Sequence, residues 1–360
     1  QWPQETRFDD LRTFEGRPLL GVHIVRYACG GISLHTKVRH QAMDGNSVWR
    51  FYNTWSNICF AKLKRHNNSS TRIHLLHTQN TSQRLDDRRL LTNRLPLYSS
   101  STRAAERYMA GVSRFLAEAA NVPMPRESPD GFQVHRFSLP KKSLIQLKRR
   151  FGNPVSGALG SVQQPNTTGY VSTNDLTCAV FWRAIARAHQ ETYPDDPYTC
   201  MMLACDVRGR IGMPHAYVGN ASFPLLLFMT KEQILSQRLT DTAMHIRRHV
   251  SMITPEFVQL TMRFMASPGS MQRLIAMFEP RRAFFSASVI SGFPMFGMAN
   301  FGFGQPVRVD IPAYLMPGFS IWMPTRSTEC PVCVNLSLTD RVFARIKDDR
   351  EFREFVDTSS

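Results

Sequence analysis

The spacing of the apolar residues changes at Gly45, and this change constrains the fold more than any other feature of the sequence. Before it, residues 19–28 and 32–39 have the pattern of strands, and Cys29-Gly30-Gly31 between them predicts the turn of a hairpin. After it, apolar residues recur every three or four positions, as on one face of a helix: Val48, Phe51, Tyr52, Trp55, Ile58 and Cys59. Residues 40–45 therefore turn the chain from a strand into a helix.

The rest of the chain mixes strands and helices without a strict alternation. Strands are expected at residues 132–139, 198–207, 223–230, 284–290, 306–311, 318–323 and 331–338. Helices are expected at 103–120, 140–151, 172–190, 231–252, 255–278 and 339–356. The pattern predicts an α/β or α+β chain with large mixed β-sheets flanked by helices.

The composition is that of a soluble globular chain, with 42% hydrophobic and 20% charged residues. No apolar run reaches membrane-spanning length, so no transmembrane helix is expected, and residues 1–10 do not resemble a signal peptide. The seven cysteines, an odd number, favour a reducing, cytoplasmic setting over a disulfide scaffold. Cys330-Pro-Val-Cys333 has no second pair, so thiols near a strand are favoured over a zinc site, and no metal is expected.

The formal net charge of +16 is compatible with three interpretations. A nucleic-acid surface is disfavoured, because the basic residues are scattered and no aromatic residues interleave with them. A polyanionic small molecule, such as a phosphate-bearing co-substrate, would be attracted electrostatically. An acidic part outside this segment would also balance the charge. The basic residues of 140–151 are candidates for phosphate attraction, although a solvated helix face explains them equally well: Lys141, Lys142, Lys148, Arg149 and Arg150.

His40 and Asp44 are the candidate catalytic residues at the strand-to-helix turn. An ordinary histidine titrates near pH 6.5, so it can accept a proton at neutral pH, and a rigid turn would hold its ring in one direction. Gly45 would let the backbone pass closely at the corner. Three roles are open for Asp44: orienting His40, pairing with an arginine elsewhere, or capping the next helix. No Gly-x-Ser-x-Gly elbow exists, so a histidine base would act directly on a substrate hydroxyl or amine.

His245 and His249 are a second histidine pair, four residues apart on an expected helix. Their neighbours Arg247 and Arg248 would repel a metal cation. A solvated helix face is therefore expected here instead of a metal site.

Three blocks of sequence resemble the BAHD acyltransferases, the acyl-CoA-dependent enzymes of plant and fungal specialised metabolism. The first is Cys29-Gly30-Gly31, a strand, and then His40-Gln-Ala-Met-Asp44-Gly45, which resembles the family's catalytic region. The second is the helix from Ser172 to Arg183, and the third is Asn300-Phe301-Gly302-Phe303-Gly304, similar to the family's Asp-Phe-Gly-Trp-Gly motif. Weaker similarities are Leu85-Asp-Asp-Arg-Arg-Leu90, Cys205-Asp-Val-Arg-Gly-Arg210 and Gly219-Asn220. The blocks stand in the family's order.

This resemblance implies two chloramphenicol-acetyltransferase-like domains with a channel between them, which acyl-CoA and the acceptor enter from opposite faces. His40 would take the proton from the acceptor, with no covalent enzyme intermediate and no permanent cofactor besides acyl-CoA as co-substrate. Asp44 would point away from the channel and pair with an arginine, for which Arg208 is the candidate because it follows the expected strand 198–207. Gly45, Arg208, Asn300, Gly302 and Gly304 would then be structural.

The chain departs from the family pattern at two places. Asn300 and Phe303 stand where the family has aspartate and tryptophan. Family members also have on the order of a hundred more residues before the histidine, so the N-terminal domain is expected to be incomplete. We expect residues 1–120 to form this partial domain, 121–171 a crossover or linker region, and 172–360 the second domain.

The predicted function is the transfer of an acyl group from acyl-CoA to a hydroxyl or amine of a small specialised metabolite, by a monomer with no nucleic-acid partner. One alternative is a condensation-type domain that uses carrier-bound thioesters, although that type shows two adjacent histidines where this chain has Arg39-His40. The other is a catalytically silent binding protein of the same fold.

Overall fold

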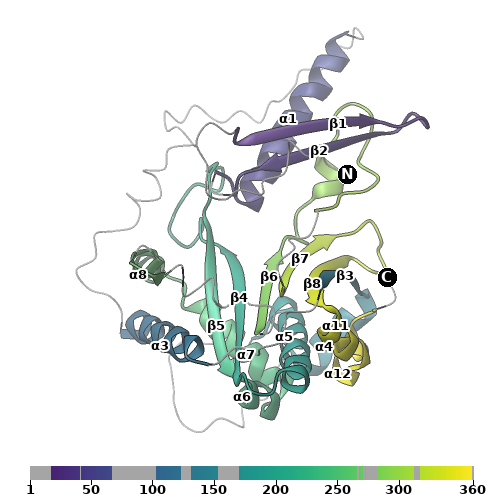
Figure 1. Ribbon diagram of the computed structural model, residues 1–360. Coiled ribbons are helices and arrows are strands. Elements are labelled where there is room, and N and C mark those ends of the chain that lie inside the picture. The colour runs from purple at the N-terminus through teal and green to yellow at the C-terminus, as the bar shows by residue number, and fades with distance from the viewer. Residues whose placement is uncertain are drawn as a thin grey trace.

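Six strands form one mixed sheet at the centre of the molecule (Figure 1). The computed structural model describes residues 18–40, 42–66, 103–122, 131–152, 170–265, 267–270, 272, 282–311 and 317–358. The strand order is β3 (Phe132–Leu139), β8 (Val332–Thr339), β7 (Phe319–Pro324), β6 (Ala283–Val289), β4 (Tyr198–Asp206) and β5 (Ser222–Thr230). β6 is parallel to β7 and β4, and the other neighbours are antiparallel. The expected α/β class with a large mixed sheet flanked by helices is therefore confirmed.

Helix α5 (Thr173–Thr192) is buried along most of its length and lies against β6 and five other helices. Ser172 and Asp175 form a capping box at its start, in which each side chain accepts from the other residue's backbone N–H, so the sequence signal for this helix start is met. The ring of Phe181 contacts those of Phe285, Trp322 and Phe352, which ties α5 to the sheet and to the last helix. The five helices are α4 (Lys141–Phe151), α6 (Lys231–Ser236), α7 (Leu239–Ser251), α11 (Asp340–Asp348) and α12 (Arg350–Phe355).

Helices α3 (Arg103–Ala120) and α8 (Pro255–Met265) pack against each other, and α3 also packs against β5, at the edge of the sheet (Figure 1). The Tyr108 hydroxyl on α3 donates to the carbonyl of Leu226 and accepts from its N–H, at 2.8 and 3.0 Å. The apolar core is thus continuous from α3 through the sheet to α12.

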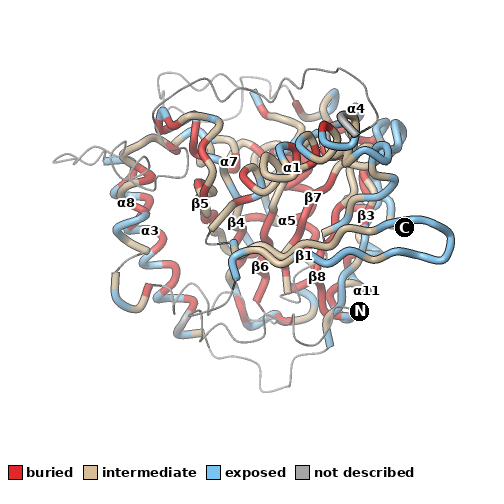
Figure 2. Tube along the Cα trace, turned by 90° about the horizontal axis from the view of Figure 1, so that it is seen from above, coloured by how far each residue is buried: buried red, intermediate tan, exposed pale blue. Residues whose placement is uncertain are grey.

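The hairpin of β1 (Leu20–Arg26) and β2 (Ile32–Val38) and the helix α1 (Gly45–His66) lie beyond one end of the large sheet (Figure 1). These elements agree with the strand, turn and helix expected on either side of Gly45. Figure 2 shows the contrast in burial, because the large sheet is mostly buried whereas the hairpin is intermediate or exposed. The turn between β2 and α1 carries His40 and Asp44.

Four of the expected elements differ in the structure. The helix predicted over 255–278 is α8, which ends at Met265, and the described residues 267–269 are not helical. The helix predicted over 231–252 is two helices, α6 (Lys231–Ser236) and α7, because the backbone is extended at Gln237 and Arg238. The helix predicted over 339–356 divides into α11 and α12, since the side chain of Asp349 accepts from the Phe352 N–H and starts a second helix. No strand forms at the described residues 306–311. There, the carboxylate of Asp310 pairs with Arg308 and with Arg136 of β3.

Candidate active site

The carboxylate of Asp44 is saturated with hydrogen bonds at the start of α1. Its Oδ1 accepts from the Ser47 N–H at 2.9 Å, which caps the helix, and its Oδ2 accepts from the Ala221 N–H at 2.7 Å. The guanidinium of Arg208 bridges both oxygens, with Nη1 2.8 Å from Oδ2 and Nη2 3.1 Å from Oδ1. Two of the roles open for Asp44, helix cap and arginine partner, are therefore present together. Within the described residues, none of its hydrogen bonds goes to His40.

Arg208 is fully buried two residues after the end of β4, and its side chain joins three segments of the chain. Besides Asp44, its Nη2 donates to Ser47 Oγ at 2.9 Å and to the Gly219 carbonyl at 3.1 Å. Its Nη1 also contacts Asp206 Oδ1 at 3.1 Å. A planar guanidinium with five donors suits this arrangement, in which carboxylates balance the buried charge.

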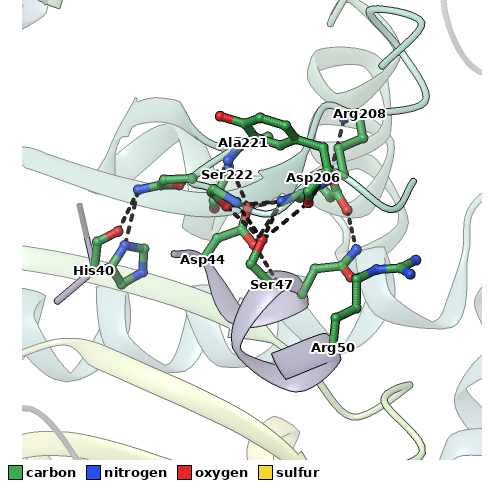
Figure 3. Close-up of polar contacts among 12 residues, drawn as sticks. His40, Asp44, Ser47, Arg50, Asp206, Arg208, Ala221 and Ser222 are labelled. Carbon is green, nitrogen blue, oxygen red and sulfur yellow. Dashed lines mark hydrogen bonds and ion pairs between the residues drawn. The ribbon is translucent and has the colours of Figure 1, made fainter. Parts of the chain in front are cut away.

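Ser47 completes this network from the first turn of α1 (Figure 3). Its hydroxyl donates to the Gly219 carbonyl at 2.7 Å and accepts from the Gly219 N–H at 3.0 Å. Ser47 was not predicted from the sequence, although its position three residues after a capping aspartate was a usable signal. The network fixes the start of α1 to the segment that leads into β5.

Asp206, at the end of β4, is the partly exposed member of the network. It accepts from Asn46 Nδ2 at 2.8 Å, and Asn46 Oδ1 in turn accepts from Arg50 Nε at 3.0 Å. Burial raises the pKa of Asp206, but hydrogen bonds from Arg208 and Asn46 outweigh burial and hold the pKa below its usual value. The negative charge of Asp206 is therefore retained beside the buried arginine.

His40 is exposed and lies four residues before Asp44 in the chain. Its hydrogen-bond partner is Asn220. The Asn220 Nδ2 donates to the His40 carbonyl at 2.9 Å and lies 3.2 Å from the ring Nδ1, and Figure 3 draws both bonds at His40. The Asn220 Oδ1 accepts from the Ser222 N–H at 3.1 Å, so the amide is held from both ends. No local sequence signal brings Asn220 to His40, since 180 positions separate them.

The loop of residues 300–304 contacts α1 further along the helix than the network around Asp44 does. Asn300 Oδ1 accepts from the N–H groups of Gly302 and Gly304 at 2.9 and 3.2 Å, and both glycines have positive φ, 107° and 101°. A Cβ on Gly302 would lie 2.4 Å from the end of the Leu63 side chain of α1, which would have to move, so the positive φ is the main reason for a glycine there. Phe301 packs edge-on against Trp55 with ring centroids 5.1 Å apart.

Gly45 does not meet the expectation of a close backbone approach. A Cβ there would stand 3.6 Å from Ile290 and from Phe293, which is an ordinary contact distance. Its φ is not in the left-handed region, so neither space nor conformation requires a glycine.

The basic residues of α4 lie on a helix that packs against α5 and α12. Lys148 donates to the Val171 carbonyl and lies over the Tyr170 ring at 4.0 Å, and Arg150 pairs with Glu354 at 2.5 Å. Two of the five basic residues therefore serve the local packing.

His245 and His249 are not on a solvated face, so that expectation is wrong. They lie on α7 with ring centroids 4.3 Å apart, partly buried beside Trp182 and Tyr108 respectively. Burial, reinforced by His249 and Arg248, lowers the pKa of His245 to about 3.

The described residues contain no group of three or more side chains arranged to hold a metal, and no described helix could span a membrane. The block at 85–90 lies outside the described residues.

Comparison with solved structures identifies proteins that share this fold. F. sporotrichioides TRI101, solved in complex with coenzyme A and T-2, aligns with a TM-score of 0.64 at 19% identity, covering 95% of this chain and 70% of that one. At that identity the likeness defines the fold. The mixed sheet flanked by helices is thus a fold that this chain shares with that protein.

The family model described as "Transferase family" matches residues 9–353, and this chain belongs to that family, the BAHD acyltransferases. Anthranilate N-benzoyltransferase protein 2 of Dianthus caryophyllus is 22% identical over 89% of this chain and 65% of its own length. Hydroxycinnamoyltransferase 1 of Oryza sativa subsp. japonica is 22% identical over 92% of this chain and 67% of its own length. The chain therefore spans about two thirds of the length of these curated relatives.

Proposed function

We propose that this chain carries the catalytic histidine of an enzyme that moves an acyl group from acyl-CoA to a hydroxyl or amine of a small metabolite. The family supports acyl transfer, and the named relatives transfer benzoyl and hydroxycinnamoyl groups. Coenzyme A in the complex of TRI101 supports acyl-CoA as the co-substrate. We retain the division into residues 1–120, 121–171 and 172–360 as part of this proposal, with β3 of the middle region joined to β8 of the last.

The exposure of His40 is the observation that carries the proposal. Asp44, the neighbouring ionisable group of the motif, is buried and committed to Arg208, Ser47 and Ala221. His40 lies outside that network with its ring open to solvent, so it is the member of the motif that a substrate can reach. Asp44 then acts through the backbone, because it fixes the start of the helix that follows His40.

The proposed chemistry needs only one side chain that moves a proton. A nitrogen of the His40 ring takes the proton from the acceptor O–H or N–H, and the acceptor atom attacks the thioester carbonyl carbon. The C–S bond breaks as the tetrahedral intermediate collapses, and the proton on His40 passes to the CoA sulfur. The products are an ester or amide and free CoA thiol, and no bond to the enzyme forms.

Substitution of His40 tests this proposal. The full chain, His40→Ala and the control His23→Ala, an exposed histidine of β1, are each given a panel of acyl-CoAs and hydroxyl or amine acceptors, scored by thiol release. His40→Ala should lose at least about a hundredfold in turnover while His23→Ala keeps it. Equal turnover by His40→Ala would contradict the role of His40.

The same assay separates the alternatives. Activity with carrier-bound thioesters and none with free CoA esters would indicate a condensation-type domain. Equal ligand binding by the wild type and His40→Ala, with turnover by neither, would indicate a silent binding protein.

A further inference from the structure

The amide of Asn220 has only one chemically sensible orientation. Its Nδ2 lies 2.9 Å from the His40 carbonyl, which can only accept, and its Oδ1 lies 3.1 Å from the Ser222 N–H, which can only donate. Exchanging the nitrogen and the oxygen would place acceptor against acceptor at one end and donor against donor at the other. The nitrogen that faces the His40 ring is therefore a donor.

This orientation determines what the ring nitrogen must be. The –NH₂ group of Asn220 has two hydrogens, one for the His40 carbonyl and one directed to His40 Nδ1 at 3.2 Å. Nδ1 consequently accepts, and the hydrogen of the neutral ring is on Nε2. Turning the ring over would set the carbon-bound hydrogen of Cδ2 against the amide hydrogen, with no bond gained.

We propose that Asn220 is a positioning residue that holds the neutral ring of His40 as its Nε2–H tautomer in the unliganded protein. The inference rests on the proposed role of His40 for its functional meaning. If Nε2 of His40 is to accept a proton, the hydrogen of the neutral ring must first be on Nδ1. If Nδ1 is to accept the proton, its lone pair must first be released from the hydrogen bond with Asn220. In either case the bond from Asn220 to Nδ1 breaks before His40 accepts a proton, so Asn220 keeps the base inactive until a ligand displaces the contact.

The tautomer can be measured without turnover, by ¹⁵N NMR of the chain with ¹⁵N-labelled histidine rings. The spectrum is recorded at a pH about two units above the ordinary histidine pKa of about 6.5, so that ordinary rings are neutral. The His40 signals are assigned as those lost in His40→Gln. We expect a pyridine-like Nδ1 and a pyrrole-like Nε2 for His40. A pyrrole-like Nδ1, or signals averaged between the tautomers, would overturn the proposal.

Two variants test whether Asn220 is the cause. Asn220→Ala should replace the fixed signature with averaged signals, while the signals of the other described histidines stay in place. Asn46→Ala, which removes a neighbouring amide that bonds to Asp206 instead of His40, should leave the His40 signals unchanged. A fixed Nε2–H signature that persists in Asn220→Ala would show that Asn220 does not set the tautomer. Because no outcome depends on activity, failure here is distinct from failure of the proposed acyl transfer.

Discussion

The guanidinium of Arg208 and the carboxylate of Asp44 form a two-point ion pair between residues 164 positions apart, with exposed fractions of 0% and 3%. This pair joins the first turn of α1 to the segment between β4 and β5, and so connects the hairpin side of the molecule to the large sheet. A buried ion pair adds little stability relative to an apolar pair, but breaking it leaves an uncompensated charge.

Asp44→Asn should therefore destabilise the fold by about 3–5 kcal/mol, because it leaves Arg208 buried without its main counter-charge. The measurement is urea unfolding, with the free energy of unfolding extrapolated to water. Asp241→Asn is the matched control, since it breaks the exposed pair with Arg238 (3.0 Å) and should cost less than about 1 kcal/mol. Equal, small losses in both variants would show that the buried pair does not support the fold.

His245 should make the protein less stable in acid. Burial lowers its folded-state pKa to about 3, whereas the unfolded chain binds the proton near pH 6.5. Its contribution is therefore complete above about pH 6.5 and is lost as the pH falls toward 3. Between pH 7 and pH 5 the wild type should lose about 2 kcal/mol more than His245→Gln in unfolding free energy. Parallel pH profiles for the two proteins would refute this assignment.

Lys231 should make the free energy of unfolding depend on pH in the alkaline range. Its fully buried ammonium donates to the Tyr193 and His189 carbonyls at the end of α5, at 2.8 and 3.3 Å, and burial lowers its pKa to about 8 despite the nearby Asp196. Between about pH 8 and 10.5 the folded chain has lost this proton while the unfolded chain keeps it, so stability rises with pH. From about pH 7.5 to about pH 9.5 the wild type should gain about 2 kcal/mol relative to Lys231→Met.

Lys231→Met is also expected to be less stable than the wild type by about 1–3 kcal/mol at neutral pH, since two buried carbonyls lose a donor. Denaturant unfolding across the pH series measures both effects. A difference between the two proteins that stays constant with pH would contradict the lowered pKa.

Asn300 gives a test of the departure from the family motif. Its Oδ1 alone holds the two glycine N–H groups of the loop, and an aspartate has the same acceptor. Asn300→Asp should thus change stability by less than about 0.5 kcal/mol, whereas Asn300→Ala should cost about 1–2 kcal/mol through two lost hydrogen bonds. Thermal unfolding distinguishes the two variants, and a large loss in Asn300→Asp would show that the loop requires the amide hydrogens.

The sequence by itself determined the elements whose signals are local. The spacing around Gly45 predicted β1, β2 and α1, and Ser172 with Asp175 marked the start of α5, because side-chain period and helix caps involve residues only a few positions apart. Arg208 was also expected as the partner of Asp44, because it follows the strand predicted at 198–207. That expectation came from the resemblance to a family and not from the spacing of residues.

Only the tertiary structure decided the features that depend on distant segments. The contact of Asn220 with His40 joins residues 180 positions apart, and the burial of His245 follows from the packing of α7 against α5. The strand expected at 306–311 was wrong, and this segment contacts β3 through the side-chain pair of Asp310 with Arg136. Each of these outcomes depends on which surfaces meet after the chain has folded, and a periodic pattern specifies only that a residue faces inward, not what it meets.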